Sequence, residues 1–114
     1  MSRDENVAVV ESFLNCIVTK DLDRLPIDPE YTAQSPLTPK LSGQAALEYL
    51  KVVAAAVKGI RVIQHIVEDN HVATFFEEDT INGSLEVFSK FQIESGRIKD
   101  VRVFYDPRPI IGSK

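Results

Sequence analysis

Three short polar turns divide residues 59–106 into four segments in which apolar and polar side chains largely alternate. Asp69-Asn70 and Asn82-Gly83 suit two-residue hairpin turns, because Asn, Asp and Gly tolerate the left-handed backbone that such turns need. Glu94-Ser95-Gly96 suits a three-residue loop with glycine at the left-handed position. The pattern predicts four consecutive antiparallel strands, at about Ile60–Glu68, His71–Thr80, Ser84–Glu94 and Arg97–Asp106.

These turns also set the register between neighbouring strands. Successive side chains of a strand point to opposite faces of a sheet, so each pairing assigns faces along both strands. The expected turns pair Glu68 with His71, Ile81 with Ser84, and Ile93 with Arg97. One face then combines apolar bulk with a few polar groups, which is typical of a ligand pocket. That face carries Arg61, Ile63, His65, Val67, Val72, Thr74, Phe76, Glu78, Leu85, Val87, Ser89, Phe91, Ile93, Val101, Val103 and Tyr105.

The opposite face of the predicted sheet is also largely apolar. Monomeric proteins rarely expose a large apolar patch, and interfaces commonly have polar residues at their edges. The composition of this face therefore predicts a homodimer formed through the sheet. Its apolar residues are Val62, Ile66, Phe75, Phe88 and Phe104, and Glu77, Lys90, Gln92 and Arg102 lie between them.

The length and composition indicate one domain that spans residues 1–114. Hydrophobic residues make up 44% of the chain and charged residues 26%, which is ordinary for a globular domain. The net charge is −4 and no basic cluster occurs, so nucleic-acid binding is not expected. The longest apolar run, Val52–Val57, is too short to span a membrane. A single cysteine, Cys16, and a polar N-terminus without a signal peptide predict a cytoplasmic protein.

Helical patterns precede the strands. Ser2 and Glu5 have the spacing of a capping box, and apolar residues at helical spacing follow them. Helices followed by strands favour an α+β fold. We expect three N-terminal helices packed on a bent antiparallel sheet of four to five strands, which together form a cone with one open end. The helices are expected at about Arg3–Thr19, Asp21–Leu25 and Gly43–Val57, with a short extended piece at Tyr31–Ser35.

The order of these features resembles the nuclear transport factor two-like superfamily, and most of all its SnoaL-like and ketosteroid-isomerase-like branches. The resemblance runs from about Asn6 to Pro109. It rests on Ser35-Pro36, on Leu41-Ser42-Gly43 opening a helix, and on a meander that ends Gly96-Arg97-Ile98…Phe104-Tyr105-Asp106. It implies a cystatin-like cone, sheet-to-sheet homodimers and a polyketide-, terpene- or steroid-like carbonyl ligand. The superfamily includes isomerases, cyclases, dehydratases, epoxide hydrolases and non-catalytic domains, so the fold does not select a function.

The catalytic residues of these families are not retained as sets. Ketosteroid isomerases use an aspartate base and an oxyanion hole made by a tyrosine and a protonated aspartate. The corresponding positions fall on Ser35, Phe13 and Ser89, and a neutral serine cannot take a proton from carbon as a carboxylate does. One aspartate of the family's epoxide hydrolases falls on Val103, and only the histidine of the SnoaL-type His/Asp arrangement has a counterpart. The ketosteroid isomerase mechanism is therefore not expected.

His65 is the main catalytic candidate. It lies in the middle of its predicted strand opposite Thr74, and histidine can donate or accept a proton near neutral pH. The alternative is a core histidine hydrogen-bonded to Thr74 or to a main-chain carbonyl. Arg61 and Glu78 face each other in this register. Glu78 could be an oriented carboxylate, or Arg61 an anchor for an anionic ligand, but we favour a cross-strand ion pair between them. The expected pocket residues are Phe13, Tyr31, Ser35, Tyr49, Arg61, Thr74, Phe76, Glu78, Ser89, Phe91, Val103 and Tyr105.

These observations predict a protein that binds a small, largely apolar or carbonyl-containing molecule in the cone. Its catalytic form would be a cofactor-independent isomerase, cyclase or lyase with acid–base chemistry centred on His65. The alternatives are a non-catalytic binder with the same pocket and an interaction module that works through the other sheet face. His65 and His71 lie on different faces without clustered ligands, and no phosphate-binding glycine loop occurs, so neither a metal nor a cofactor is expected.

Overall fold

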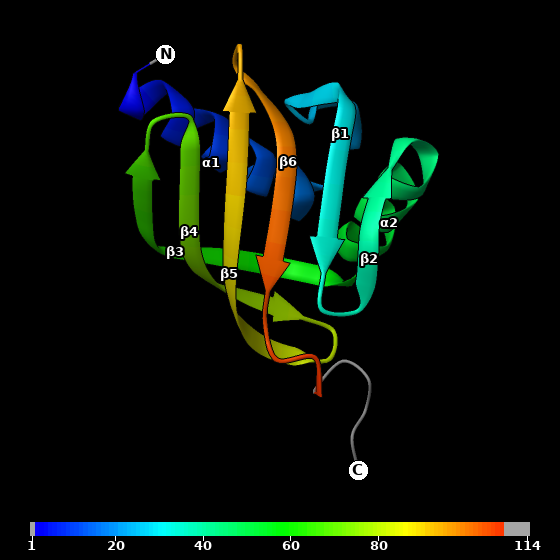
Figure 1. The fold of residues 1–114 in the computed structure, drawn as a ribbon. Helices are drawn as coiled ribbons and strands as arrows, with labels where there is room; N and C mark the ends of the chain where they lie inside the picture. The colour runs from blue at the N-terminus through cyan, green and yellow to red at the C-terminus, as the bar shows by residue number, and fades with distance from the viewer. Residues whose placement is uncertain (1, 109–114) are drawn as a thin grey trace.

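The computed structural model describes residues 2–108, which form two α-helices, a short 3₁₀ helix and one six-stranded sheet (Figure 1). The strand order is β2-β1-β6-β5-β4-β3, in which β1 and β6 run parallel and all other neighbours run antiparallel. The helices are α1 (Arg3–Thr19), η1 (Leu22–Arg24) and α2 (Gly43–Ala56). The strands are β1 (Ile27–Ser35), β2 (Thr38–Ser42), β3 (Val57–Glu68), β4 (His71–Thr80), β5 (Gly83–Glu94) and β6 (Arg97–Phe104).

The α+β class is confirmed, but the expected three helices and purely antiparallel sheet of four to five strands are wrong. The Asp21–Leu25 segment forms only the short η1. Strand β2 was not expected because it contains Pro39, which cannot donate a ladder hydrogen bond; the edge position of β2 makes this proline tolerable. Strands β1 and β6 can run parallel because β2, α2 and three further strands separate them, which supplies the long crossover that parallel pairing needs.

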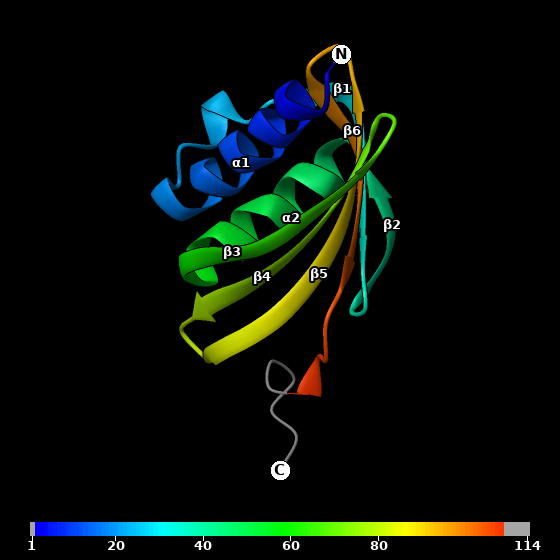
Figure 2. The same ribbon diagram turned by 90° about the vertical axis from the view of Figure 1, so that its left-hand side faces the viewer.

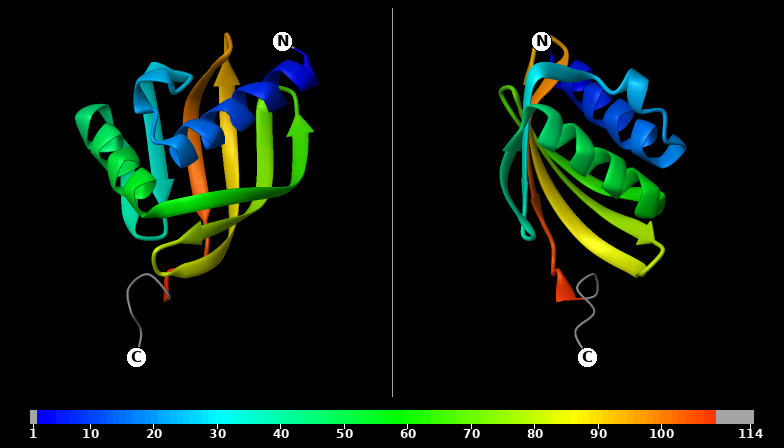
Figure 3. Two further views of the ribbon diagram at one scale, coloured as in Figure 1. Left: turned by 180° about the vertical axis from the view of Figure 1, so that it is seen from behind. Right: turned by 90° about the vertical axis from the view of Figure 1, so that its right-hand side faces the viewer.

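Both α-helices cover the same face of the sheet, and the sheet curves around them (Figures 2 and 3). The hydrophobic core lies between this concave face and the helices, and it includes Val10, Leu50, Phe91 and Ile98, each at most 4% exposed. No described helix or strand covers the opposite, convex face, which is called the outer face below. None of the helices within residues 2–108 is long and apolar enough to span a membrane.

Helix α1 has the expected bounds because both of its ends are specified locally. The Ser2 side chain accepts a hydrogen bond from the Glu5 backbone N–H, and the Glu5 side chain accepts one from the Ser2 backbone, which completes the capping box. Lys20 ends the helix in the left-handed conformation, and its ammonium group donates to the backbone carbonyls of Ala54 and Val57. This contact ties the end of α1 to the end of α2.

The first two hairpins preserve the expected faces. Glu68 pairs with His71, as predicted. The second turn is Ile81-Asn82 with Thr80 paired with Gly83, so the predicted pairing of Ile81 with Ser84 is wrong. The turn lies one residue earlier than expected, which displaces the pairing between β4 and β5 by two residues. Because side chains alternate with a period of two, inward residues of β4 still pair with inward residues of β5.

The third hairpin differs from the prediction but reaches the same result through a bulge. Ser95 and Gly96 both have positive φ and form a two-residue turn in which Glu94 pairs with Arg97, so the expected three-residue loop is absent. The register then shifts at Lys99, where β6 has one residue more than β5. This extra residue keeps Val101 and Val103 on the concave face, as predicted.

A second bulge, in β3, overturns two predictions. Val62 pairs with Phe76 whereas Gln64 pairs with Phe75, so Ile63 is an extra residue on β3. Residues 60–62 are therefore on the opposite face from the one expected. Arg61 lies on the outer face, where it donates a hydrogen bond to Glu77, and it is not a pocket residue. Val62 packs against the core and does not belong to the outer face.

Candidate functional site

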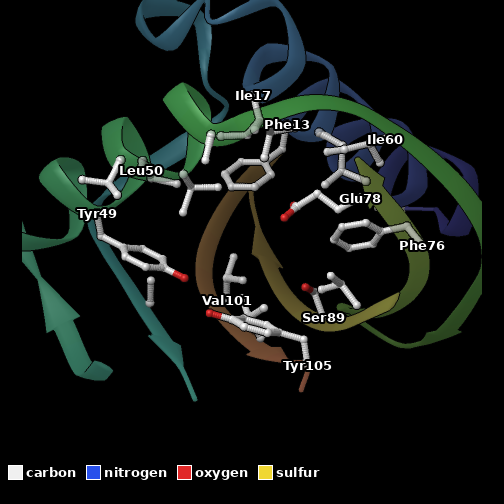
Figure 4. A pocket seen from close by; sticks show the side chains of 18 of the residues that line it. Phe13, Ile17, Tyr49, Leu50, Ile60, Phe76, Glu78, Ser89, Val101 and Tyr105 are labelled. Carbon is white, nitrogen blue, oxygen red and sulfur yellow. The ribbon is translucent and has the colours of Figure 1, made fainter. Parts of the chain in front are cut away.

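A cavity of about 190 Å³ opens between the two helices and the concave face of the sheet (Figure 4). Its wall is mainly aliphatic and aromatic, because α1, α2 and the inward residues of the curved strands all present apolar side chains there. Phe13 of α1 meets Phe91 of β5 edge to face, with ring centroids 5.6 Å apart and planes at 69°, which fixes both rings in the wall. Among the described lining residues none is a lysine, arginine or histidine.

Glu78 is the one acidic side chain among the lining residues that the structure describes, and its carboxylate points into the cavity (Figure 4). Its cross-strand neighbours are Ile60 and Leu85, both apolar. Within residues 2–108 the carboxylate has neither a hydrogen-bond donor nor an ion-pair partner, because Arg61 bonds to Glu77 on the outer face instead. Burial without a counter-charge raises the pKa of Glu78 to about 7, so both its protonated and its ionised form are populated near neutral pH.

The three tyrosines of the chain, Tyr31, Tyr49 and Tyr105, all contribute to the cavity wall. Burial raises the pKa of each phenol, so all three hydroxyls stay protonated at neutral pH and can donate hydrogen bonds. Tyr49 comes from α2 and Tyr105 follows β6, and their hydroxyls point toward each other in the part of the cavity away from Phe76 (Figure 4). Hydrogen bonding by the Ser35 side chain opposes the rise in the pKa of Tyr49 and of Tyr105.

The structure brings together most of the residues that the sequence places in the pocket. Ser35 is buried beside the cavity rather than in its wall and also contacts the Thr38 hydroxyl. Ile60 and Val57 of β3 line the wall although they were not predicted there. The bulge at Ile63 turns Ile60 inward, and a further register shift between Val57 and Gly59 places Val57 on the same face. Of the predicted set, the lining residues are Phe13, Tyr31, Tyr49, Phe76, Glu78, Ser89, Phe91, Val103 and Tyr105.

His65 lies outside the described wall of this cavity. Its Nδ1 is 2.8 Å from the hydroxyl oxygen of Thr74, which is fully buried, and its Nε2 is 3.0 Å from a carboxylate oxygen of Glu11 on α1. Both ring nitrogens therefore have protein partners, and the imidazole connects β3 to β4 and to α1. This geometry matches the alternative reading of a structural histidine, with Glu11 as a second partner.

Replacing His65 by Ala is expected to lower the free energy of unfolding by about 2 kcal/mol, because the buried Thr74 hydroxyl loses its partner and a void forms. The affinity of the cavity for a ligand is expected to stay within about twofold of the unchanged protein, since His65 does not reach the cavity. Urea unfolding and ligand titration measure the two effects separately. If His65→Ala instead loses ligand affinity while its stability is unchanged, His65 belongs to the ligand site.

No protein-family model and no curated protein sequence matches the chain. Its structure is similar to that of an NTF2-like protein of unknown function from Cytophaga hutchinsonii, at 18% identity with a TM-score of 0.80 over 93% of this chain and 94% of that one. An LEH-like epoxide hydrolase from M. tuberculosis has 19% identity and a TM-score of 0.79, with 95% and 87% covered. A putative SnoaL-like polyketide cyclase from Jannaschia sp. CCS1 has 15% identity and a TM-score of 0.79, with 97% and 93% covered. At these identities the likeness concerns the fold, and the chain therefore has the nuclear transport factor two-like fold.

Proposed function

We propose that the protein binds a small, largely apolar molecule in the cavity between its helices and its sheet. The observation that carries this proposal is an apolar wall interrupted at a few places by polar groups that face inward, above all Glu78 and the Tyr49 and Tyr105 hydroxyls. Ligand sites in proteins commonly combine apolar walls with a small number of polar groups that orient the ligand. The likeness in fold to a putative SnoaL-like polyketide cyclase and to an LEH-like epoxide hydrolase supports a small-molecule site here.

The volume limits the size of the ligand. An apolar cavity of about 150 Å³ is known to bind benzene, so one of this size suits a single substituted ring. The cavity has about 190 Å³ of free volume, which supports a ligand with one ring, or one ring of a longer molecule that extends through the mouth.

Acid–base chemistry, if the bound molecule reacts, would be centred on Glu78 rather than on His65. A carboxyl group with a pKa of about 7 can accept or donate a proton at neutral pH, as an isomerase, cyclase or lyase without a cofactor requires. The Tyr49 and Tyr105 hydroxyls could stabilise an oxygen on which negative charge develops. A non-catalytic binder would use the same groups to orient its ligand.

Tyrosine fluorescence provides a direct test of binding, because the chain has no tryptophan and all three tyrosines line the cavity. Titration with carvone, a cyclic ten-carbon enone, is expected to change this fluorescence with a saturating dependence on concentration. Replacing Val103 by Phe fills part of the cavity and is expected to weaken the binding at least about tenfold. Replacing the outward-facing neighbour Arg102 by Gln is the control and is expected to leave the affinity unchanged. Equal carvone affinity in the Val103→Phe variant and the unchanged protein would place the binding elsewhere.

A second candidate function, as an interaction surface for another copy of the chain, is favoured by the outer face. Phe75, Phe88 and Phe104 form one continuous row across β4, β5 and β6, because each is the cross-strand partner of the next. Phe88 and Phe104 are 40% and 47% exposed, and Ile66 nearby is 52% exposed. A monomer would leave this apolar row in water. We therefore propose a homodimer in which two outer faces pack together; this proposal is independent of the cavity.

A further inference from the structure

We infer that the ligand of the cavity is an apolar amine, bound as its ammonium ion with Glu78 as counter-ion and aromatic rings around its apolar part. The inference rests on the proposed function, because it names the class of small molecule that the cavity would hold. It is carried by the one-sided charge of the cavity wall and by the placement of the aromatic rings.

The charge of the wall favours a cationic ligand. Glu78 is the only residue of the described wall that carries a charge when ionised at neutral pH, and no basic residue faces it. An anionic ligand would therefore meet repulsion and find no partner. An ionised carboxylate without a partner is costly in apolar surroundings, so a ligand that supplies a positive charge gains a charge-assisted hydrogen bond and relieves that cost. A neutral ligand gains neither.

The neighbouring acidic residue, Glu77, shows why a cationic ligand is expected at Glu78 in particular. Glu77 directly precedes Glu78 on β4 and points to the outer face, where Arg61 pairs with it at 3.2 Å. The β3 bulge that turns Arg61 outward is what leaves Glu78 without a basic partner on the concave face. The fold thus pairs Glu77 with Arg61 on the outer face, whereas the carboxylate of Glu78 faces the cavity.

Aromatic rings surround the space in front of the carboxylate. Phe13, Phe76 and Tyr105 lie around Glu78 in the wall, with Tyr49 facing it from α2 (Figure 4). The faces of such rings carry partial negative charge and attract ammonium groups, most strongly where water is excluded. An alkylammonium ion can thus place its charge beside Glu78 and its hydrocarbon part against the rings.

The pH dependence of binding follows from the groups that face Glu78. These are Tyr49 from α2 and Tyr105 from the end of β6, both neutral at the pH values concerned, while α1, β3 and β5 present Phe13, Ile60 and Ser89. The ammonium ion binds the ionised form of Glu78. Because the pKa of Glu78 is about 7 in the folded protein, the ionised fraction falls about thirty-fold between about pH 8.5 and about pH 5.5, and the affinity for the ammonium ion should fall with it.

The test compares cyclohexylmethylamine with cyclohexylmethanol, which have the same size and differ in one polar group. Affinities are measured by calorimetry and by tyrosine fluorescence at both pH values. At the higher pH the amine is expected to bind at least about tenfold more tightly than the alcohol. This preference should disappear at the lower pH and in Glu78→Gln. Glu77→Gln removes the same charge from the outer face and is expected to keep the preference.

The outcomes separate this inference from the proposed function. If the alcohol binds as tightly as the amine, or if Glu78→Gln keeps the preference, the amine inference is overturned while the cavity remains a binding site. If neither molecule binds at any pH although the protein is folded, the proposed function fails and this inference fails with it. A preference for the amine that also disappears in Glu77→Gln would assign the effect to the overall charge of the protein rather than to the cavity.

Discussion

Replacing Glu78 by Gln is expected to stabilise the protein, measured without added ligand, by about 3 kcal/mol near pH 8.5 and to change its stability little near pH 4. The pKa of Glu78 is about 7 in the folded protein and lies near its usual value of 4.5 in the unfolded chain. A carboxyl group with a raised folded-state pKa contributes its full stability below the unfolded pKa and loses it as the pH rises through the folded pKa. The free energy of unfolding therefore declines between about pH 4.5 and 7. Glutamine does not ionise, so this decline is absent from the variant.

Urea unfolding of the two proteins at several pH values measures this effect as a difference between two stability curves. The curves are expected to coincide at low pH and to separate as Glu78 ionises in the unchanged protein. Glu77→Gln is the matched control: its carboxylate is partly exposed and paired with Arg61, so its removal should cost little and produce no such separation. Parallel curves for Glu78→Gln and the unchanged protein would show that the buried carboxylate has a partner in solution and would remove the basis for acid–base chemistry at this residue.

Local sequence signals predicted the elements that depend on local chemistry. The capping box determined where α1 begins, and the Asp69-Asn70 turn determined the pairing of Glu68 with His71. The predicted faces of β4 and β5 were correct although the turn between them was misplaced by one residue. The misplaced turn displaces the pairing by two residues, which preserves the alternation of side chains. The presence of Glu78 in the cavity could therefore be predicted from its strand alone.

The features that the sequence could not predict depend on how the helices and strands pack against one another. Nothing in the sequence around Ile63 marks the extra residue in β3, where a bulge, which bends its strand, lies in a sheet that curves around the helices (Figure 2). That single residue turns Arg61 outward and removes the ion pair expected for Glu78, which changes the chemistry of the site. His65 was a reasonable catalytic candidate by residue type, but its contact with Glu11 of α1 depends on how the helix packs across the sheet.

Replacing Phe104 by Asp is expected to convert a homodimer into a monomer, with a rise in the dissociation constant of at least about a thousandfold. The substitution removes an aromatic ring from the row of Phe75, Phe88 and Phe104 and would bury an unpaired carboxylate in the interface. Sedimentation velocity over a range of protein concentrations measures the change. Ile81→Asp is the control, because Ile81 is 69% exposed but lies in the turn after β4, away from the aromatic row. A monomeric unchanged protein at micromolar concentration would contradict the proposal.

The charges beside the aromatic row determine which orientation such a dimer should adopt. Lys90 pairs with Arg102 on one side of the row, and Glu77 pairs with Glu86 on the other. Like charges on paired residues are unfavourable within one sheet, and Arg61 relieves only Glu77. A two-fold axis along the row would place the basic side of one copy against the acidic side of the other, whereas an axis along the strands would bring like charges together.

This orientation makes a prediction that the apolar row alone does not make. Lys90→Glu and Glu86→Lys should each weaken the dimer, because each places like charges across the interface. The protein that carries both changes should recover most of the affinity, because positions 86 and 90 then exchange their charges and stay complementary across the interface. Recovery in the double variant supports the axis along the row. If instead the two losses simply add, the charged residues do not meet across the interface, and the dimer must pack with another axis.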